Sequence, residues 1–170
     1  MKYIITLILI SFSQSTMADN TLRFSDYTSN LRVIEIDNTQ SVVRFSGEVE
    51  VSGTIVFRLD MLSETEYGEP LFVDFIPAPN QTSLFPEVIS GFYAGSLNQI
   101  SLLNTDELYT RLFGSESEHK SRELRIAGTL RLNSFSTRVE CDSRQYSANL
   151  VSFSQNESVS AINRQPIHGC

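Results

Sequence analysis

One stretch, Val43–Met61 (VRFSGEVEVSGTIVFRLDM), most constrains what this chain can fold into. From Phe45 onward every odd position is apolar or glycine, and the even positions are polar apart from Val56. Side chains alternate between the two faces of a β-strand, so this pattern predicts β structure with one buried face. Its odd-numbered apolar side chains are therefore expected in one core: Phe45, Val49, Val51, Ile55, Phe57 and Leu59.

The same stretch bears on whether the chain turns back on itself here. A two-residue hairpin loop would move the buried face from odd to even positions, and no such change occurs. Two forms stay open: a continuous strand bent at Gly47 and Gly53, or a hairpin with an odd-numbered loop. Glycine inside a strand usually marks a bulge or bend, so we favour a strand that curls around a small barrel. A break of the alternation at Ser52-Gly53 would instead indicate a β-sandwich built from plain hairpins.

The first residues have the pattern of a secretory signal peptide. Lys2 supplies the positive start, residues 3–12 form a short apolar run, and Thr16-Met17-Ala18 offers small residues for cleavage before Asp19. We therefore expect a secreted or periplasmic bacterial protein with no membrane span. The expected organisation is a signal peptide at 1–18, a flexible arm at 19–30, a single β domain at 31–153 and a C-terminal tail at 154–170.

The charge of the chain argues against two classes of partner. The 170 residues carry a formal net charge of −7, and removal of the leader, which holds one lysine and no acid, makes it −8. Nucleic acids and anionic membranes are bound by clustered Lys and Arg. The composition therefore indicates no nucleic-acid partner, and it leaves the oligomeric state open.

Two cysteines, Cys141 and Cys170, follow the leader. An even number in an exported chain favours a disulfide, which here would tie the C-terminal tail back to a late strand. A reactive or intermolecular thiol at Cys170 is the alternative.

Turn residues and apolar spacing predict the remaining elements. The clearest helix has Asn104 or Thr105 as its cap and ends at Gly114. A change of buried face across Asn133-Ser134 predicts a two-residue β-hairpin turn there, and Pro86 is expected to open a short helix. The expected strands are Leu31–Ile36, Val49–Met61, Leu71–Ile76, Gln99–Leu103, Leu124–Leu132, Phe135–Cys141 and Tyr146–Phe153, and the expected helices are Asp106–Phe113 and Glu87–Ser90.

Three strands, a helix and two further strands form the element order of the five-stranded OB-type barrel. The amino-acid sequence of several segments also resembles an uncharacterised family of small secreted bacterial proteins with an OB-like fold. The resemblance covers about residues 49–132 and is carried by Val51–Ile55, Glu69–Phe75, Asn104–Gly114 and Glu123–Leu130. It implies a mainly β fold, a small OB-like barrel with an added N-terminal strand. The family offers no established catalytic residues, and this chain departs from it in its first strand, its hairpin and its last cysteine.

Motifs for catalysis or metal binding are weak. His119 and His168 have no third ligand at metal spacing, so no metal is expected, and nothing indicates a cofactor. Ser117 and Lys120 match S-x-x-K, but the motifs that accompany it in the enzymes are absent from the sequence. We therefore assign no catalytic residue. A small hydrolase using Ser117, Lys120 or a carboxylate pair stays an alternative.

OB barrels bind ligands across their second and third strands and the neighbouring loops. On this chain that analogy points to five binding residues: Phe72, Asp74, Phe85, Phe92 and Tyr93. The aromatic residues among them have an alternative role as cover for the core. The favoured hypothesis is an exported, non-enzymatic binding module for a protein, peptide or glycan of the cell envelope. A structural or assembly subunit is the other alternative.

Overall fold

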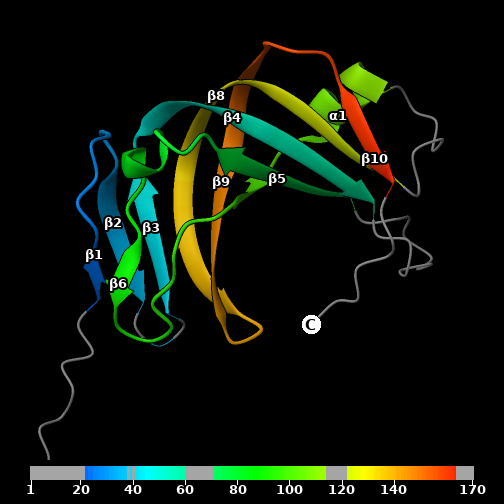
Figure 1. The fold of residues 1–170 in the computed structure, drawn as a ribbon. Helices are drawn as coiled ribbons and strands as arrows, with labels where there is room; N and C mark the ends of the chain where they lie inside the picture. Colours follow the sequence, from blue (N-terminus) through cyan, green and yellow to red (C-terminus); the bar gives the residue numbers. More distant parts are fainter. Residues whose placement is uncertain (1–21, 38, 40, 60–70, 114–121, 164–170) are drawn as a thin grey trace, which may run out of the picture.

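The computed structural model describes residues 22–37, 39, 41–59, 71–113 and 122–163. These residues form a mainly β structure with one α-helix (Figure 1). The elements in chain order are β1 (Arg23–Phe24), β2 (Arg32–Asp37), β3 (Val42–Ser46), β4 (Glu48–Leu59), β5 (Leu71–Pro77), a 3-10 turn (Thr82–Leu84), β6 (Val88–Ser90), β7 (Ile100–Leu103), α1 (Asp106–Phe113), β8 (Arg122–Glu140), β9 (Ser143–Gln155) and β10 (Ser160–Asn163).

Strand β8, 19 residues long, is the spine of the fold. Along one edge it pairs with β4 over its first part and with β3 near its end. Along the other edge it pairs with β10 first and with β9 afterwards. All four pairings are antiparallel, so β3 and β4 run in the same direction, as do β9 and β10.

Five strands of the sheet close into a ring. Strand β4 joins β8 to β5, β5 pairs with β7, and β7 pairs in parallel with β9, which returns to β8. Helix α1 lies between β7 and β8 in the chain and packs on the core. The ring centroids of its Tyr109 and Phe113 lie 5.9 and 5.1 Å from that of Phe57 in β4. An eight-residue helix is too short to be stable alone, so its packing on the core, through these rings and the buried Leu108, stabilises it.

The core face predicted for the opening stretch is confirmed. Phe45, Val49, Val51, Ile55 and Phe57 are all at most 5% exposed and belong to one hydrophobic core. The side chain of Leu59 lies outside the described residues. Strand β4 crosses Ser52-Gly53 without a break, and β3 and β4 run in one direction, so the hairpin alternative for this stretch is wrong.

The two glycines act in different ways. Gly47 has a φ of +113° and separates β3 from β4, so it interrupts an otherwise continuous path along β8. Gly53 stands directly opposite Gly128 of β8 and pairs with Pro77 of β5 on its other side. A Cβ on Gly53 would lie 2.3 Å from the carbonyl oxygen of Ile76. Glycine is therefore required here by the close approach of β5.

The hairpin predicted at Asn133-Ser134 is wrong. Strand β8 continues through these residues, and the β8–β9 register shifts between Asn133 and Ser136, where Ser134 has a φ of 51°. An extra residue in one strand reverses the side-chain faces just as a two-residue turn does, so the alternation cannot distinguish them. The hairpin turn lies instead at Cys141-Asp142, with φ values of 47° and 56°. Two successive left-handed residues are typical of the type I′ turn.

Several peripheral segments gain their structure from tertiary pairing. The helix expected at Glu87–Ser90 is wrong, because Val88–Ser90 is strand β6, paired with β1. Strand β1 lies within the segment expected to be a flexible arm, and β10 within the segment expected to be a tail. The predicted strand Leu31–Ile36 corresponds to β2. Cys170 lies outside the described residues, so its disulfide with Cys141 stays a prediction.

Candidate binding surface

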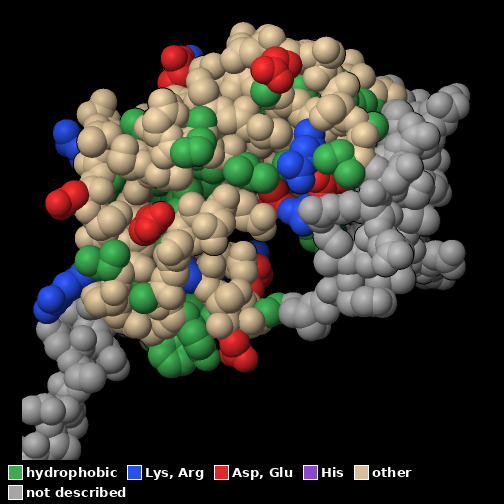
Figure 2. All heavy atoms as spheres, viewed as in Figure 1, with side chains coloured by type: hydrophobic (Ala, Val, Ile, Leu, Met, Phe, Trp, Pro, Cys, Tyr) green, Lys and Arg blue, Asp and Glu red, His purple; other side chains and the backbone are tan. Residues whose placement is uncertain are grey.

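Four charged side chains alternate across the outer face of β5, β4 and β8. Arg58 in β4 forms an ion pair with Asp74 in β5. In β8, Arg125 Nη2 lies 2.5 Å from Glu123 Oε1. The β4–β8 register sets Arg58 directly opposite Glu123, so the two ion pairs are neighbours. Figure 2 shows Arg and acidic side chains next to one another over this part of the sheet.

The two carboxylates are buried and the two guanidinium groups are partly exposed. The side chains of Asp74 and Glu123 are 7% and 1% exposed, against 25% for Arg58 and 37% for Arg125. Ser101 Oγ of β7 also donates a hydrogen bond to Asp74 Oδ1 at 3.1 Å. A buried carboxylate is stable only when it is paired and hydrogen-bonded, and Asp74 meets both conditions. The guanidinium groups of Arg58 and Arg125 therefore lie at the surface, and the carboxylates of Asp74 and Glu123 lie beneath it.

Exposed apolar side chains flank these charges. Phe72 (52% exposed) stands opposite Arg58, and Ile162 of β10 (42% exposed) stands opposite Glu123. In β7, Leu103 (50% exposed) lies two residues from Ser101, which stands opposite Asp74, so Leu103 shares the face of Asp74 and Phe72. Opposite residues of an antiparallel pair share a face. We call this line of side chains the outer row: Leu103, Phe72, Arg58, Glu123 and Ile162.

Of the five binding residues predicted from the sequence, Phe72 and Asp74 lie together on this face. Phe85 lies in the core instead. It is 1% exposed, and its ring centroid is 5.2 Å from that of Phe135. Phe85 therefore covers the core, which was the alternative role for the aromatic residues.

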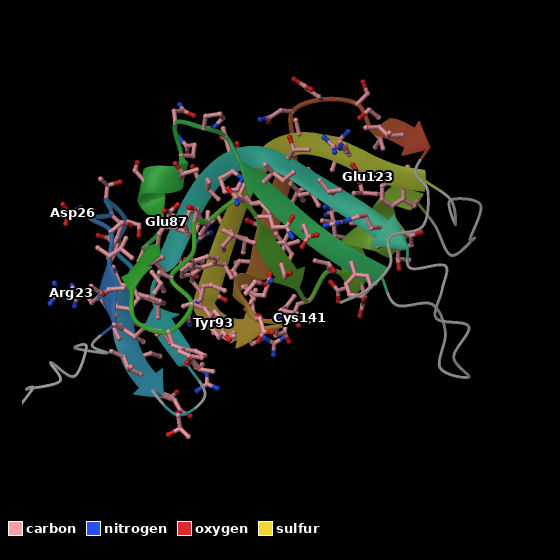
Figure 3. All side chains as sticks on the ribbon, turned by 60° about the horizontal axis from the view of Figure 1, so that its bottom comes forward. Arg23, Asp26, Glu87, Tyr93, Glu123 and Cys141 are labelled. Atoms are coloured by element: carbon pink, nitrogen blue, oxygen red, sulfur yellow. The ribbon has the colours of Figure 1, made fainter. Side chains whose placement is uncertain are left out.

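Phe92 and Tyr93 lie on the loop after β6, near the end of β8 that is far from Glu123 (Figure 3). Phe92 is 60% exposed, and its ring centroid is 4.1 Å from that of Tyr93. The Tyr93 hydroxyl donates a hydrogen bond to Asp142 Oδ1 at 3.2 Å, and this bond raises the pKa of Tyr93. The predicted residues therefore divide among two separate surfaces and the core.

Arg144 in β9 is hydrogen-bonded to the Phe92-Tyr93 loop. Its guanidinium donates hydrogen bonds to the backbone carbonyl oxygens of Phe92, Tyr93 and Ser41. Arg144 is only 7% exposed, and burial lowers its pKa. Two of the three carbonyls belong to residues with left-handed backbone, Ser41 and Tyr93. Three hydrogen bonds to the charged guanidinium offset the strain of these turns.

Tyr146, two residues further along β9, is 3% exposed. Its hydroxyl donates to the carbonyl oxygen of Gly95 at 2.6 Å and accepts from the backbone N–H of Val88 at 3.0 Å. Burial is the main reason that the pKa of Tyr146 is raised above its usual value. The folded state therefore holds this proton more tightly than the unfolded state does.

This raised pKa predicts a loss of stability at high pH. Above about pH 10 the unfolded chain releases the tyrosine proton while the folded chain keeps it, so the free energy of unfolding falls as the pH rises. Tyr146→Phe removes the titrating group. In urea denaturation at a series of pH values, the wild type is expected to lose stability more steeply than the variant above about pH 10. Parallel curves for the two proteins would contradict the assignment.

The sequence did not reveal most of the outer row. The alternation of the strands identified outward-facing polar positions, among them Arg58 and Glu123 of the outer row and the neighbouring Arg125. It did not identify their partners, because these depend on strand register. Leu103 and Ile162 carried no signal, because each is one apolar residue near the end of a short segment. Ser117 and Lys120, the candidate hydrolase residues, lie outside the described residues, as do both histidines.

No family model, curated protein or solved structure matches the chain. Within the described ranges, no helix is long and apolar enough to cross a membrane. The described residues also contain no cluster of three His, Cys, Asp or Glu side chains suited to a metal ion.

Proposed function

We propose that this chain is an exported, non-enzymatic binding module of the bacterial cell envelope, and that it holds a segment of another protein on the outer row. The observation that carries this proposal is the set of exposed apolar side chains beside partly exposed arginines. Phe72, Leu103 and Ile162 are each at least 42% exposed on one face of the sheet. Large side chains exposed together commonly mark interaction sites.

The chemistry of the face favours a polypeptide over a glycan. Sugars are held by polar groups that are open to the ligand, in addition to aromatic stacking. Here the carboxylates of Asp74 and Glu123 are buried behind arginines and are already engaged. Apolar side chains with guanidinium heads between them suit a segment that carries both apolar and acidic residues.

We further propose that the five-stranded ring is an OB-like barrel, as in the family of small secreted bacterial proteins that the sequence resembles. The order of its elements supports this: β4, β5 and β7, then α1, then β8 and β9. In OB barrels the second and third strands form the ligand face. The corresponding strands here are β5 and β7, which carry Phe72 and Leu103.

Site-specific photocrosslinking in the exporting cell tests the binding face. A benzophenone amino acid is placed at Phe72, at Leu103 and, as a matched control, at Val151 of β9, which is 43% exposed and outside the outer row. We expect one and the same adduct from positions 72 and 103 and none from position 151. Adducts of equal yield at all three positions, or none at 72 and 103, would refute the proposed face.

The adduct then identifies the partner, and a purified partner allows a quantitative test. Phe72→Ala is expected to weaken binding about tenfold or more, because buried aromatic anchors dominate such interfaces. Val151→Ala is the control and should leave the affinity unchanged.

A further inference from the structure

An exposed aromatic pair lies where the loop after β6 meets the turn between β8 and β9 (Figure 3). The rings of Phe92 and Tyr93 are inclined to each other by 71°, with their centroids 4.1 Å apart, so their faces form two sides of a corner. Phe92 is 60% exposed, and Tyr93 is partly exposed. Among the described residues, neither ring packs against a further aromatic ring. Much of the surface of this pair is therefore open to solvent.

A carboxylate lies beside this corner. The Tyr93 hydroxyl donates a hydrogen bond to Asp142 Oδ1 at 3.2 Å, so the carboxyl group is next to the Tyr93 ring. Asp142 is exposed, and no Lys or Arg of the described residues forms an ion pair with it. The last charged residues of β8, Arg138 and Glu140, pair with each other at 2.7 Å. The negative charge at the edge of the corner is therefore available to a cation.

The positive charge of Arg144 does not occupy this corner. Its guanidinium donates hydrogen bonds to the backbone carbonyl oxygens of Phe92 and Tyr93, so it lies on the backbone side of the loop. It is only 7% exposed. The same hydrogen bonds fix the loop before a ligand arrives. A site that is already ordered loses less conformational entropy on binding.

We propose that this aromatic corner, made of Phe92, Tyr93 and Asp142, binds a quaternary ammonium group. A cation over an aromatic face is attracted by the negative charge of the π electrons. In the angle between the two rings the cation contacts both faces, while the carboxylate of Asp142 supplies the opposite charge. The formal net charge of the chain, −7, also favours the approach of a cation.

The aromatic corner fits a quaternary ammonium better than a primary one. A primary ammonium, such as that of lysine, is strongly hydrated and would have to give up water at a site that stays open to solvent. A quaternary ammonium has no N–H groups, and its methyl groups pack on the ring faces. Two rings do not enclose the ligand, so we expect a dissociation constant on the order of 1–10 mM.

A comparison of two ligands of the same shape tests the proposal on the wild type. Choline is titrated into the purified chain at constant ionic strength, and the backbone amide shifts are followed by two-dimensional NMR. Dimethylbutanol, in which an uncharged tert-butyl group replaces the trimethylammonium group, is titrated in parallel. We expect choline to shift the amides of Phe92, Tyr93 and Asp142 in a saturable way. The dissociation constant for dimethylbutanol should be higher by at least about fivefold.

Two substitutions test the separate contributions to binding. Phe92→Leu keeps an apolar side chain but removes an aromatic face, and Asp142→Asn keeps an acceptor for the Tyr93 hydroxyl but removes the charge. Asn also tolerates the left-handed backbone at this position, where φ is 56°. Each variant is expected to raise the dissociation constant for choline about fivefold. Glu157→Gln, which removes an exposed carboxylate beyond the other end of β9, is the control and should leave it unchanged.

Three results would overturn the proposal. The first is the absence of any saturable shift with choline up to about 100 mM. The second is equal binding of choline and dimethylbutanol, which would show an apolar contact without a part for the charge. The third is an equal loss of affinity in Asp142→Asn and Glu157→Gln. Because the comparison of the two ligands uses the wild type, a variant that fails to fold does not affect it.

Vesicles distinguish the two sources of such a group. Co-sedimentation with phosphatidylcholine vesicles, but not with phosphatidylglycerol vesicles, would assign a lipid headgroup, whereas choline binding without co-sedimentation would assign a free solute. The aromatic corner shares no residue with the outer row and lies near the end of β8 that is far from Glu123. Failure of the choline titration would therefore leave the crosslinking result at Phe72 and Leu103 unaffected, and the reverse also holds.

Discussion

Replacing Gly53 by alanine is expected to lower the free energy of unfolding by about 3 kcal/mol. The added Cβ would lie 2.3 Å from the carbonyl oxygen of Ile76 and 2.7 Å from two ring carbons of Phe75. The carbonyl is part of the backbone of β5, which is held against β4 over seven residue pairs. Because it cannot rotate away as a flexible side chain would, the two strands must separate locally. Urea denaturation of the variant measures the loss.

Thr54→Ala is the matched control for this substitution. It changes the next residue of the same strand, which is partly exposed, and is expected to alter the free energy of unfolding by less than about 1 kcal/mol. Equal denaturation midpoints for Gly53→Ala and the wild type would show that the close approach of β5 is not needed for stability.

Arg144→Met is expected to lower the free energy of unfolding by about 2–3 kcal/mol. The substitution keeps much of the apolar stem but removes three charge-assisted hydrogen bonds to the carbonyls of Ser41, Phe92 and Tyr93. Those carbonyls then lose their partner, and the left-handed residues Ser41 and Tyr93 lose the contact that holds them. We expect faster amide hydrogen exchange in the loop around Phe92 in addition to the lower stability.

Arg138→Met provides the comparison for Arg144. Arg138 is 60% exposed and pairs on the surface with Glu140, so its loss should change the free energy of unfolding by less than about 1 kcal/mol. If both arginine variants were equally stable, Arg144 would have no special part in joining the turn at Ser41 to the Phe92-Tyr93 loop.

The two predictions differ in how far the sequence supports them. A bend at Gly53 was expected from its place in a long alternating strand. What the structure shows there is the close approach of the β5 backbone, which the sequence did not indicate. Nothing in the polar segment around Arg144 indicated a buried guanidinium, because its three acceptors come from turns more than fifty residues earlier in the chain. A side chain whose partners are distant backbone atoms leaves no local pattern.

The candidate site was also predictable only in part from the sequence. Phe72 and Asp74 were expected on the ligand face by analogy with OB barrels, and they lie side by side on the outer surface of β5. Arg58 and Glu123 complete the surface, but their meeting depends on the β4–β8 register. Phe92 and Tyr93 were expected with them and lie at the far end of β8, because the loop after β6 is bound by Arg144 and Asp142.

By itself, the sequence determined the β character of the chain, the buried face of residues 43–57 and the helix Asp106–Phe113, since alternation, spacing and caps are local properties of the backbone. Only the tertiary structure decided that Asn133-Ser134 is a bulge within one strand and that the hairpin turns at Cys141-Asp142. It also decided which outward charges meet on the outer row and which strand, β2, comes first in the order of the sheet. Strand pairing joins residues far apart in the chain, and the alternation within one strand does not specify its neighbour.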